Sequence, residues 1–304
     1  MVGQRVVVRR LVRGETGPTG GPAMTDLLGV CIAWGDGVCV VQPETGEAVS
    51  IALADIVSGK PVPPRPSIRQ RVSARESEAH TGALWPAVER VALGGWELRC
   101  DPAPVGRVLK RANSCLAMGG PGLPLPQALA GIEAFYAERG REPLAQVEAG
   151  SPEEDAFRDA GWLPLDHGES ELWLASVSRV RRQLPPSARP VELVVNGPRA
   201  IASVGAGCDP LAEGHAAIDG DWVGLHGVTV DPTHRRRGLA TAVVAELLEW
   251  GAEQGAMTAW LHVETDNPGA QALWAALGLA PHHACRYYAP PSPDSSASAS
   301  PVNR

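Results

Sequence analysis

The sequence is poor in aromatic residues, and it lacks both a cysteine pair at metal-binding spacing and a long apolar run. It has 3 Tyr and 2 Phe beside 9 Trp, and its 6 cysteines are scattered without a CxxC motif. This scatter argues against a zinc site or a disulfide framework, so we expect reduced thiols in a cytoplasmic protein and no bound metal. The N-terminal region has no apolar run as long as that of a signal peptide, and no stretch elsewhere approaches the roughly 20 apolar residues of a membrane helix. No membrane association is therefore expected.

The charge balance is acidic, with a formal net charge of −7. A surface that binds nucleic acid needs clustered Lys and Arg to neutralise phosphates, so nucleic acid is not an expected partner. The net charge does not exclude a local basic patch. The 304 residues exceed one ordinary domain of about 100 to 200 residues. The length therefore predicts two or three domains.

The first domain, residues 1–66, is predicted to be all β. Strands are expected at 5–9, 28–34, 38–41 and 48–53, from apolar alternation between turn residues. Gly35-Asp36-Gly37 has the composition of a hairpin turn. Such a short meander suits a small closed barrel, because closure removes exposed sheet edges. Prolines between residues 61 and 66 mark the boundary.

The rest of the chain has a mixed α and β pattern that repeats. Segments 137–140, 146–148, 151–152 and 161–162 recur at 252–255, 262–264, 267–268 and 278–279, with an offset of 115 to 117 residues. We infer two copies of a helix–strand–helix–strand unit, in halves 67–180 and 181–290, with chance similarity of short matches as the alternative. Residues 291–304 are rich in Ser, Pro and Ala, and we expect them to be disordered.

Three consecutive arginines follow a predicted strand at 222–230 and a turn at 231–234, and they open a predicted amphipathic helix. Cations are unfavourable at this end of a helix, where the dipole stabilises anions by about 0.3 to 1 kcal/mol. A bound pyrophosphate would resolve the conflict, because the N–H groups of 236–241 can cradle it, and Gly238 and Ala240 allow close approach. The alternative is a solvated basic turn.

Two segments then resemble a known family. Val228-Thr-Val-Asp-Pro-Thr-His-Arg-Arg-Arg-Gly-Leu-Ala240 resembles motif A of the GNAT superfamily of N-acetyltransferases, and Asn267-Pro-Gly-Ala-Gln-Ala-Leu-Trp-Ala-Ala-Leu-Gly-Leu279 is similar to its motif B. The resemblance implies an α/β (α+β) GNAT fold, with a mixed sheet flanked by helices, and acetyl-CoA as co-substrate. The residues implied in acetyl-CoA binding are Val228, Thr229, Val230, Arg235, Arg236, Arg237, Gly238, Leu239, Ala240, Thr241, Asn267 and Trp274.

Within motif B, Asn267 is a good helix N-cap from its residue type alone. The resemblance implies in addition that it contacts the pantetheine arm, and that the backbone of Val228 and Val230 pairs with that arm like an added strand. Trp274 stands where motif B usually carries the tyrosine that protonates the leaving thiolate, and indole cannot supply this proton. We therefore expect Trp274 to be core or pocket wall.

The catalytic acid and base have separate candidates. Tyr287 and Tyr288 are substitutes for the missing acid, with packing as the alternative. His226 is the candidate base, because an imidazole titrates near neutral pH and strand alternation places it on the face of Val228. Glu264 is a second candidate for base or substrate contact.

The first half lacks the phosphate-binding pattern, since its matching stretch is Gly120-Pro-Gly-Leu-Pro-Leu125. This resembles the tandem GNAT arrangement of the mycothiol synthase type, with one degenerate and one active half. The barrel, the stretch from Arg111 to Ser114 and Arg286-Tyr-Tyr288 together resemble an actinobacterial group of GNAT proteins with an N-terminal Src-homology-3-like barrel. Arg111, Asn113 and Ser114 are candidate acceptor-binding residues, with a turn cap as the alternative.

The predicted function is transfer of an acetyl group from acetyl-CoA to a primary amine by direct attack. The alternative is a regulatory or scaffolding protein that binds acetyl-CoA without turnover, which Trp274 favours. A further possibility is that the N-terminal barrel delivers the transferase to a macromolecule. The sequence leaves the acceptor open between a small amine, an antibiotic and a protein, and it does not predict the oligomeric state.

Overall fold

Contacts divide the chain into two units, Met1–Ser67 and Ile68–Arg304. The structure is a computed structural model that describes residues 2–17, 20–43, 45–62, 68–104, 106, 108–185, 189–205 and 209–291. The predicted disordered tail therefore lies, apart from residue 291, outside the described residues.

The N-terminal unit is an antiparallel sheet in the order β4-β3-β2-β1-β5. Its strands are β1 (Arg5–Thr16), β2 (Pro22–Gly35), β3 (Val38–Pro43), β4 (Val49–Ala52) and β5 (Ile56–Pro61), with a 3-10 turn at Leu53–Asp55. The predicted hairpin turn is confirmed, because Asp36 and Gly37 have φ of 52° and 79°, as a two-residue β-turn requires. The expected closure is not shown: the strand order leaves β4 and β5 as unpaired edges within the described residues.

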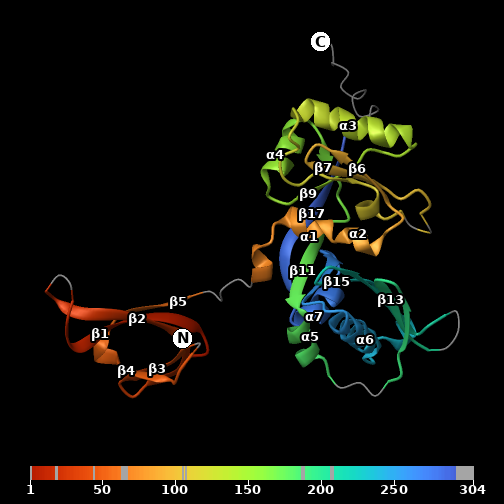
Figure 1. The fold of residues 1–304 in the computed structure, drawn as a ribbon. Helices are drawn as coiled ribbons and strands as arrows, with labels where there is room; N and C mark the ends of the chain where they lie inside the picture. The colour runs from red at the N-terminus through yellow and green to blue at the C-terminus, as the bar shows by residue number, and fades with distance from the viewer. Residues whose placement is uncertain are drawn as a thin grey trace, which may run out of the picture. The chain divides into compact units, whose positions relative to one another are not determined.

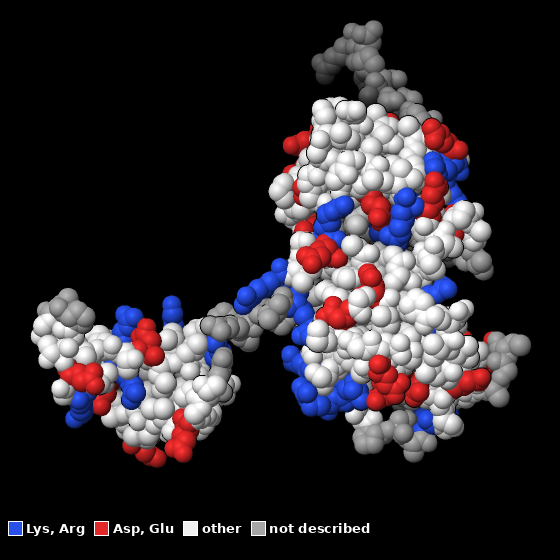
Figure 2. Space-filling view, viewed as in Figure 1, with Lys and Arg blue, Asp and Glu red and all other residues white. Residues whose placement is uncertain are grey.

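Charges of both signs are interspersed on each unit in the view of Figure 2. In the N-terminal unit, Arg9 pairs with Asp26 at 2.8 Å and Arg13 pairs with Asp55 at 2.8 Å. These pairs neutralise the charge of two arginines of β1. Within the described residues, no helix combines the length and apolar character needed to cross a membrane.

The second unit contains one mixed sheet in the order β12-β13-β14-β15-β16-β11-β17-β9-β8-β7-β6, with β10 paired to β17. Its strands are β6 (Glu89–Leu93), β7 (Trp96–Cys100), β8 (Cys115–Leu116), β9 (Ala145–Glu148), β10 (Leu163–Pro164), β11 (Ser170–Ser176), β12 (Glu192–Asn196), β13 (Arg199–Val204), β14 (Ala212–Asp219), β15 (Trp222–Val230), β16 (Thr258–Glu264) and β17 (Ala280–Ala289). Its α-helices are α1 (Ala74–Ala79), α2 (Thr81–Leu84), α3 (Leu125–Glu138), α4 (Pro152–Asp159), α5 (Val177–Gln183), α6 (Leu239–Glu253) and α7 (Pro268–Ala276).

The predicted order helix–strand–helix–strand is present twice, as α3-β9-α4-β10 and as α6-β16-α7-β17. The second helix of each copy begins with an equivalent cap. Ser151 accepts a hydrogen bond from the Glu154 N–H, and Asn267 accepts one from the Ala270 N–H. The tandem GNAT arrangement itself remains a resemblance.

The two predicted halves exchange strands. β11 belongs to the first half by sequence, yet it lies between β16 and β17 of the second and is antiparallel to both. In return, the end of β17 pairs with β9, from Cys285 opposite Glu148 to Tyr288 opposite Ala145. The halves therefore share one hydrogen-bonded sheet.

Helices cover the sheet in separate groups (Figure 1). α5, α6 and α7 pack on one face of the second half, over a core that includes Val223, Leu225, Leu247 and Leu261. α2 covers the opposite face, where Leu84 packs with other large side chains of β15 and β16. α3 and α4 pack against the strands of the first half.

Some strand predictions were wrong or missed. The stretch from Val105 to Ala117 reads as strand-like in the sequence, but Lys110–Ala112 is a 3-10 turn and only Cys115–Leu116 is extended in a ladder. Residues 105 and 107 lie outside the described residues. β11 and β14 were not predicted. β14 carries Gly, His, Ala and Ala at positions 214 to 217, so its period-two pattern is weak.

Candidate functional site

Strands β15 and β16 are parallel neighbours that separate after a short contact. Trp222, Val223 and Gly224 pair with Thr258, Ala259 and Trp260. Beyond Gly224 and Trp260 the ladder between them ends within the described residues, although β15 continues to Val230. β15 remains paired to β14 on its other edge. We call the region beyond this last pair the strand opening. There the facing edges of β15 and β16 no longer pair with each other, and an extended ligand can add to such main-chain groups.

A β-bulge lies in β15 at the strand opening. Glu213 of β14 is opposite Thr229, whereas His215 is opposite His226, so β15 carries one extra residue. Gly227 takes up the bend with a φ of 60°. The bulge shifts the alternation by one position, and Val228 faces α6 together with Leu225.

The bulge corrects the predicted position of His226. Uninterrupted alternation would place it on the face of Val228 and Val230, but those side chains pack on the α6 core. His226 lies on the opposite face, with its ring 4.9 Å from that of His215 and 5.8 Å from that of Trp85. Burial and the nearby His215 lower the pKa of His226 to about 4, so its imidazole is neutral at neutral pH.

The arginine run lies in a turn directly before α6. Arg236 and Gly238 have φ of 61° and 76°, and the helix begins at Leu239. Left-handed residues in a turn can direct neighbouring N–H groups toward a common point, as in anion-binding nests. The side chains of all three arginines are exposed. The three arginines therefore precede the helix, whereas the sequence analysis predicted that they open it.

Two neighbours hold this turn in place. Asp231 accepts hydrogen bonds from the N–H of Thr233 at 2.7 Å and from its hydroxyl, which fixes the chain where it leaves β15. The side chain of Leu239 is buried in the α6 core, which anchors the start of the helix. The N–H groups of Leu239, Ala240 and Thr241 lie in the first turn, where the helix offers them no carbonyl acceptor.

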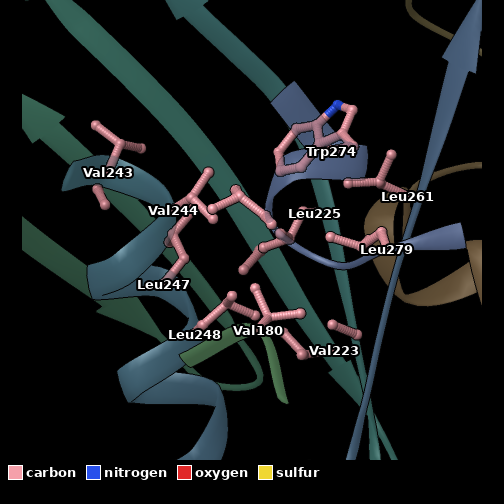
Figure 3. Close-up of a cluster of buried hydrophobic side chains, with 14 of the residues drawn as sticks. Val180, Val223, Leu225, Val243, Val244, Leu247, Leu248, Leu261, Trp274 and Leu279 are labelled. Carbon is pink, nitrogen blue, oxygen red and sulfur yellow. The ribbon is translucent and has the colours of Figure 1, made fainter. Parts of the chain in front are cut away.

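The two predicted cofactor-binding residues of the α7 segment, Asn267 and Trp274, differ in their exposure. Asn267 caps the helix and is exposed. Trp274 is 6% exposed and packs with Ala270, Leu273 and Leu277, which confirms the predicted core position. Figure 3 shows its ring in the buried cluster beside Leu261.

The two tyrosines lie on the first-half side of the sheet. Tyr288 is fully buried and donates a hydrogen bond to Glu154 Oε1 at 2.9 Å. Tyr287 lies on β17 opposite Gln146, with Lys110 Nζ 5.5 Å from its ring centroid. Burial raises the pKa of both phenols. β11 and β16 lie between β17, which carries both tyrosines, and the strand opening.

The other candidates have mixed positions. Glu264 is exposed at the end of β16, opposite Ser170 of β11. Asn113 accepts a hydrogen bond from the Asp101 N–H and donates one to the Leu109 carbonyl, as a turn cap does. Ser114 Oγ accepts a hydrogen bond from the buried guanidinium of Arg99.

Two features of this region were not predicted from the sequence. A cavity of about 290 Å³ lies on the His226 side of β13 to β15, with Leu84, Val194, Ile201 and His215 in its lining. In addition, Glu78 of α1 accepts a hydrogen bond from His262 of β16 at 2.6 Å, and both side chains are buried. The available signal was a polar residue, His262, within the otherwise apolar stretch of β16.

Comparison with known proteins gives related sequences over nearly the whole chain. A sequence profile described as "Probable histone acetyltransferase Rv0428c C-terminal" matches residues 163–288. The Mycobacterium tuberculosis protein of that name, probable histone acetyltransferase Rv0428c, is 30% identical over 312 residues, which span 94% of this chain and 94% of the relative. The uncharacterized N-acetyltransferase YobR of Bacillus subtilis is 25% identical over 69% of this chain and 96% of its own length.

Among solved structures, a GCN5-related N-acetyltransferase from Kribbella flavida has a similar fold. The TM-score is 0.57 at 17% identity, and the match covers 74% of this chain and 98% of that structure.

Proposed function

This chain belongs to the GNAT-type N-acetyltransferase family, and we propose that it transfers an acetyl group from acetyl-CoA to a primary amine. The observation that carries the proposal is the strand opening of β15 and β16 beside the positive-φ turn of Arg236 and Gly238. An extended ligand with a pyrophosphate at one end fits both features, because the turn offers converging N–H donors and the opening offers strand edges.

The proposed binding mode assigns a role to each part. The pyrophosphate lies on the N–H groups of 236–241, and the arginine side chains add positive charge around it. The pantetheine arm lies along the β15 edge at Val228 and Val230, with Asn267 on the α7 side of the opening. The thioester carbonyl is polarised by backbone N–H groups of β15 near the bulge.

The acceptor amine attacks the thioester directly in this proposal, without an acyl-enzyme. Holding both reactants in register supplies much of the rate, since a bimolecular step becomes effectively unimolecular. We place the acceptor on the face of the opening opposite α6, because the cavity beside His226 opens there. The mycobacterial relative is named a probable histone acetyltransferase, so lysine-containing peptides are acceptors to test beside small amines.

The test is calorimetric titration with acetyl-CoA, followed by a free-thiol release assay over small amines, aminoglycosides and lysine peptides. We expect binding and amine-dependent thiol release with one class of acceptor. Binding without release from any acceptor would favour the second candidate, a protein that binds acetyl-CoA without turnover. The presence of tryptophan at position 274, where motif B usually carries a tyrosine, favours this candidate. No binding would reject the proposal.

A further inference from the structure

A buried polar cluster lies under α1 on the sheet face opposite α6. We define it as Glu78, His262, His283 and Cys285. Glu78 Oε1 lies 2.6 Å from His262 Nε2, 3.3 Å from His283 Nε2 and 3.3 Å from Cys285 Sγ. Arg111 approaches the same groups and helps to lower the pKa of His262.

This cluster does not have the composition of a core. Glu78 is 0% exposed, and its second oxygen, Oε2, has no hydrogen-bond partner among the described residues. Among the same residues, Nε2 of His283 has no partner that meets hydrogen-bond geometry. Buried polar atoms are nearly always satisfied, and an unsatisfied one costs about 1 to 3 kcal/mol. Because burying a carboxylate and two imidazoles here costs stability, we look for a function that these side chains perform.

His262 belongs to the part of β16 that borders the strand opening. The ladder between β15 and β16 ends at Trp260, and His262 lies two residues farther along β16. Its other edge pairs with Leu172 of β11, so its free edge lines the opening. By alternation His262 shares the face of Trp260, the same face on which His226 lies across the opening.

We propose that His262 accepts the proton of the acceptor amine and that Glu78 positions its imidazole. This inference rests on the proposed acetyl transfer and names the residues that perform its proton transfers. The amine nitrogen forms a bond to the acetyl carbon, the carbon–sulfur bond breaks, and sulfur leaves with the electron pair. The amine proton passes to Nδ1 of His262, which then returns it to the thiolate, so that the products are the acetylated amine, free CoA thiol and a neutral imidazole.

The protonation states agree with this role. The hydrogen bond to Glu78 uses Nε2, which leaves Nδ1 as the ring nitrogen that accepts a proton. Burial, with Arg111 beside it, lowers the pKa of His262 to about 4, so the ring is neutral and able to act as a base at neutral pH. Burial raises the pKa of Glu78, but His262 and His283 outweigh it, and the pKa lies well below the usual range. The carboxylate is therefore charged, and it stabilises the imidazolium while the proton is held.

A single shuttling histidine also accounts for the missing tyrosine of motif B. Trp274 cannot donate a proton, and Tyr288 is occupied with Glu154. A group that takes the amine proton and hands it to the thiolate makes a separate acid unnecessary.

The test compares variants of the full chain in thiol release and in acetyl-CoA binding. His262→Gln is expected to lower kcat by about 100-fold or more, as loss of a general base does, with the Kd for acetyl-CoA within about twofold. His262→Ala is expected to regain part of its rate in proportion to added imidazole, which a structural role would not produce. His167→Gln, on a side chain that is 69% exposed, is the matched control and is expected to keep the wild-type rate.

Glu78→Gln is the second variant, in case His262 variants do not fold. It keeps an oxygen for the Nε2 hydrogen bond but removes the charge, so kcat is expected to fall by about 10-fold with acetyl-CoA affinity retained. A His262→Gln or Glu78→Gln protein that folds and retains kcat within threefold would overturn the inference, as would loss of turnover in His226→Gln alone. An inactive wild-type protein would instead remove the proposed function, and this inference with it.

Discussion

Arg236 and Gly238 both have left-handed backbone conformations, with φ of 61° and 76°, on either side of Arg237 and directly before α6. A non-glycine residue in this region costs about 1 kcal/mol or more, and such conformations cluster at functional sites. The conformation turns the backbone N–H groups outward at the end of β15, next to the strand opening. In the proposed binding mode, the strained turn and the opening are parts of one site.

Gly238→Ala tests this turn. Alanine at a φ of 76° is strained even though an added Cβ would meet no atom of the described residues within 4 Å. We expect the free energy of unfolding to fall by about 1 kcal/mol and acetyl-CoA to bind at least 10-fold more weakly, because the nest is distorted. Gly238→Asp adds a carboxylate and should abolish binding. Denaturant unfolding and calorimetry measure the two effects.

Gly255→Ala is the matched control for this prediction. Gly255 follows the other end of α6 with a φ of 88°, and an added Cβ there also meets nothing within 4 Å. It should lose similar stability and keep the wild-type affinity. Equal affinities in the Gly238 and Gly255 variants would remove the nest from the binding site.

The equivalent caps of the two copies give a second prediction. Asn267→Ala and Ser151→Ala each delete the side-chain acceptor for an N–H three residues later, so each should lower the free energy of unfolding by about 1 kcal/mol. Only Asn267→Ala should also weaken acetyl-CoA binding, by about 3- to 10-fold, because only its helix borders the opening. If calorimetry gives the same Kd for both variants, Asn267 is a cap and no more.

Local patterns in the sequence were sufficient for much of this site. The strand at β15, the turn, the helix from Leu239 and the cap at Asn267 follow from alternation, helix periodicity and residue preferences. The face of His226 did not follow, because one inserted residue at Gly227 reverses the alternation. A bulge depends on the pairing register with β14, which a single strand's sequence does not reveal.

The Glu78–His262 pair could not be predicted from the sequence, for a different reason. The two residues are 184 positions apart, and they meet on a sheet in which β11 and β17 join the two halves. The repeat predicts the elements of each copy but not that the last strands cross over. Long-range pairing of this kind is set by tertiary packing, which local propensity does not encode.

Tyr288→Phe gives the third prediction. Removing the hydroxyl breaks the buried hydrogen bond to the charged Glu154, which should cost about 1.5 to 3 kcal/mol in unfolding free energy. Turnover should stay within about twofold of wild type if His262 carries the proton. Tyr136→Phe, which loses a buried hydrogen bond to the Arg99 carbonyl in the same core, is the control. If turnover slows by about 10-fold or more in the Tyr288 variant alone, Tyr288 is restored as the acid.

His226 makes stability depend on pH. Its pKa is about 4 in the folded protein, against the ordinary value of 6.5 that we take for the unfolded chain, so the unfolded state binds more protons between these values. The free energy of unfolding should therefore decrease as pH falls from 6.5 to 4, by about 3 kcal/mol from this residue at 1.36 kcal/mol per pKa unit. His226→Gln has no group to protonate, so its loss of stability over this interval should be smaller than that of wild type by this amount.

The measurement is urea unfolding at several pH values between 4 and 7, with the difference between wild type and variant followed across the series. The His167→Gln variant serves as the reference, because it also replaces one histidine, at a side chain that is 69% exposed. A constant difference between wild type and His226→Gln from pH 7 to 4 would mean that His226 is protonated in the folded protein as readily as in the unfolded chain. The face opposite α6 would then be open to water at His226, and the cavity beside it would be a solvent-filled surface rather than a closed pocket for the acceptor.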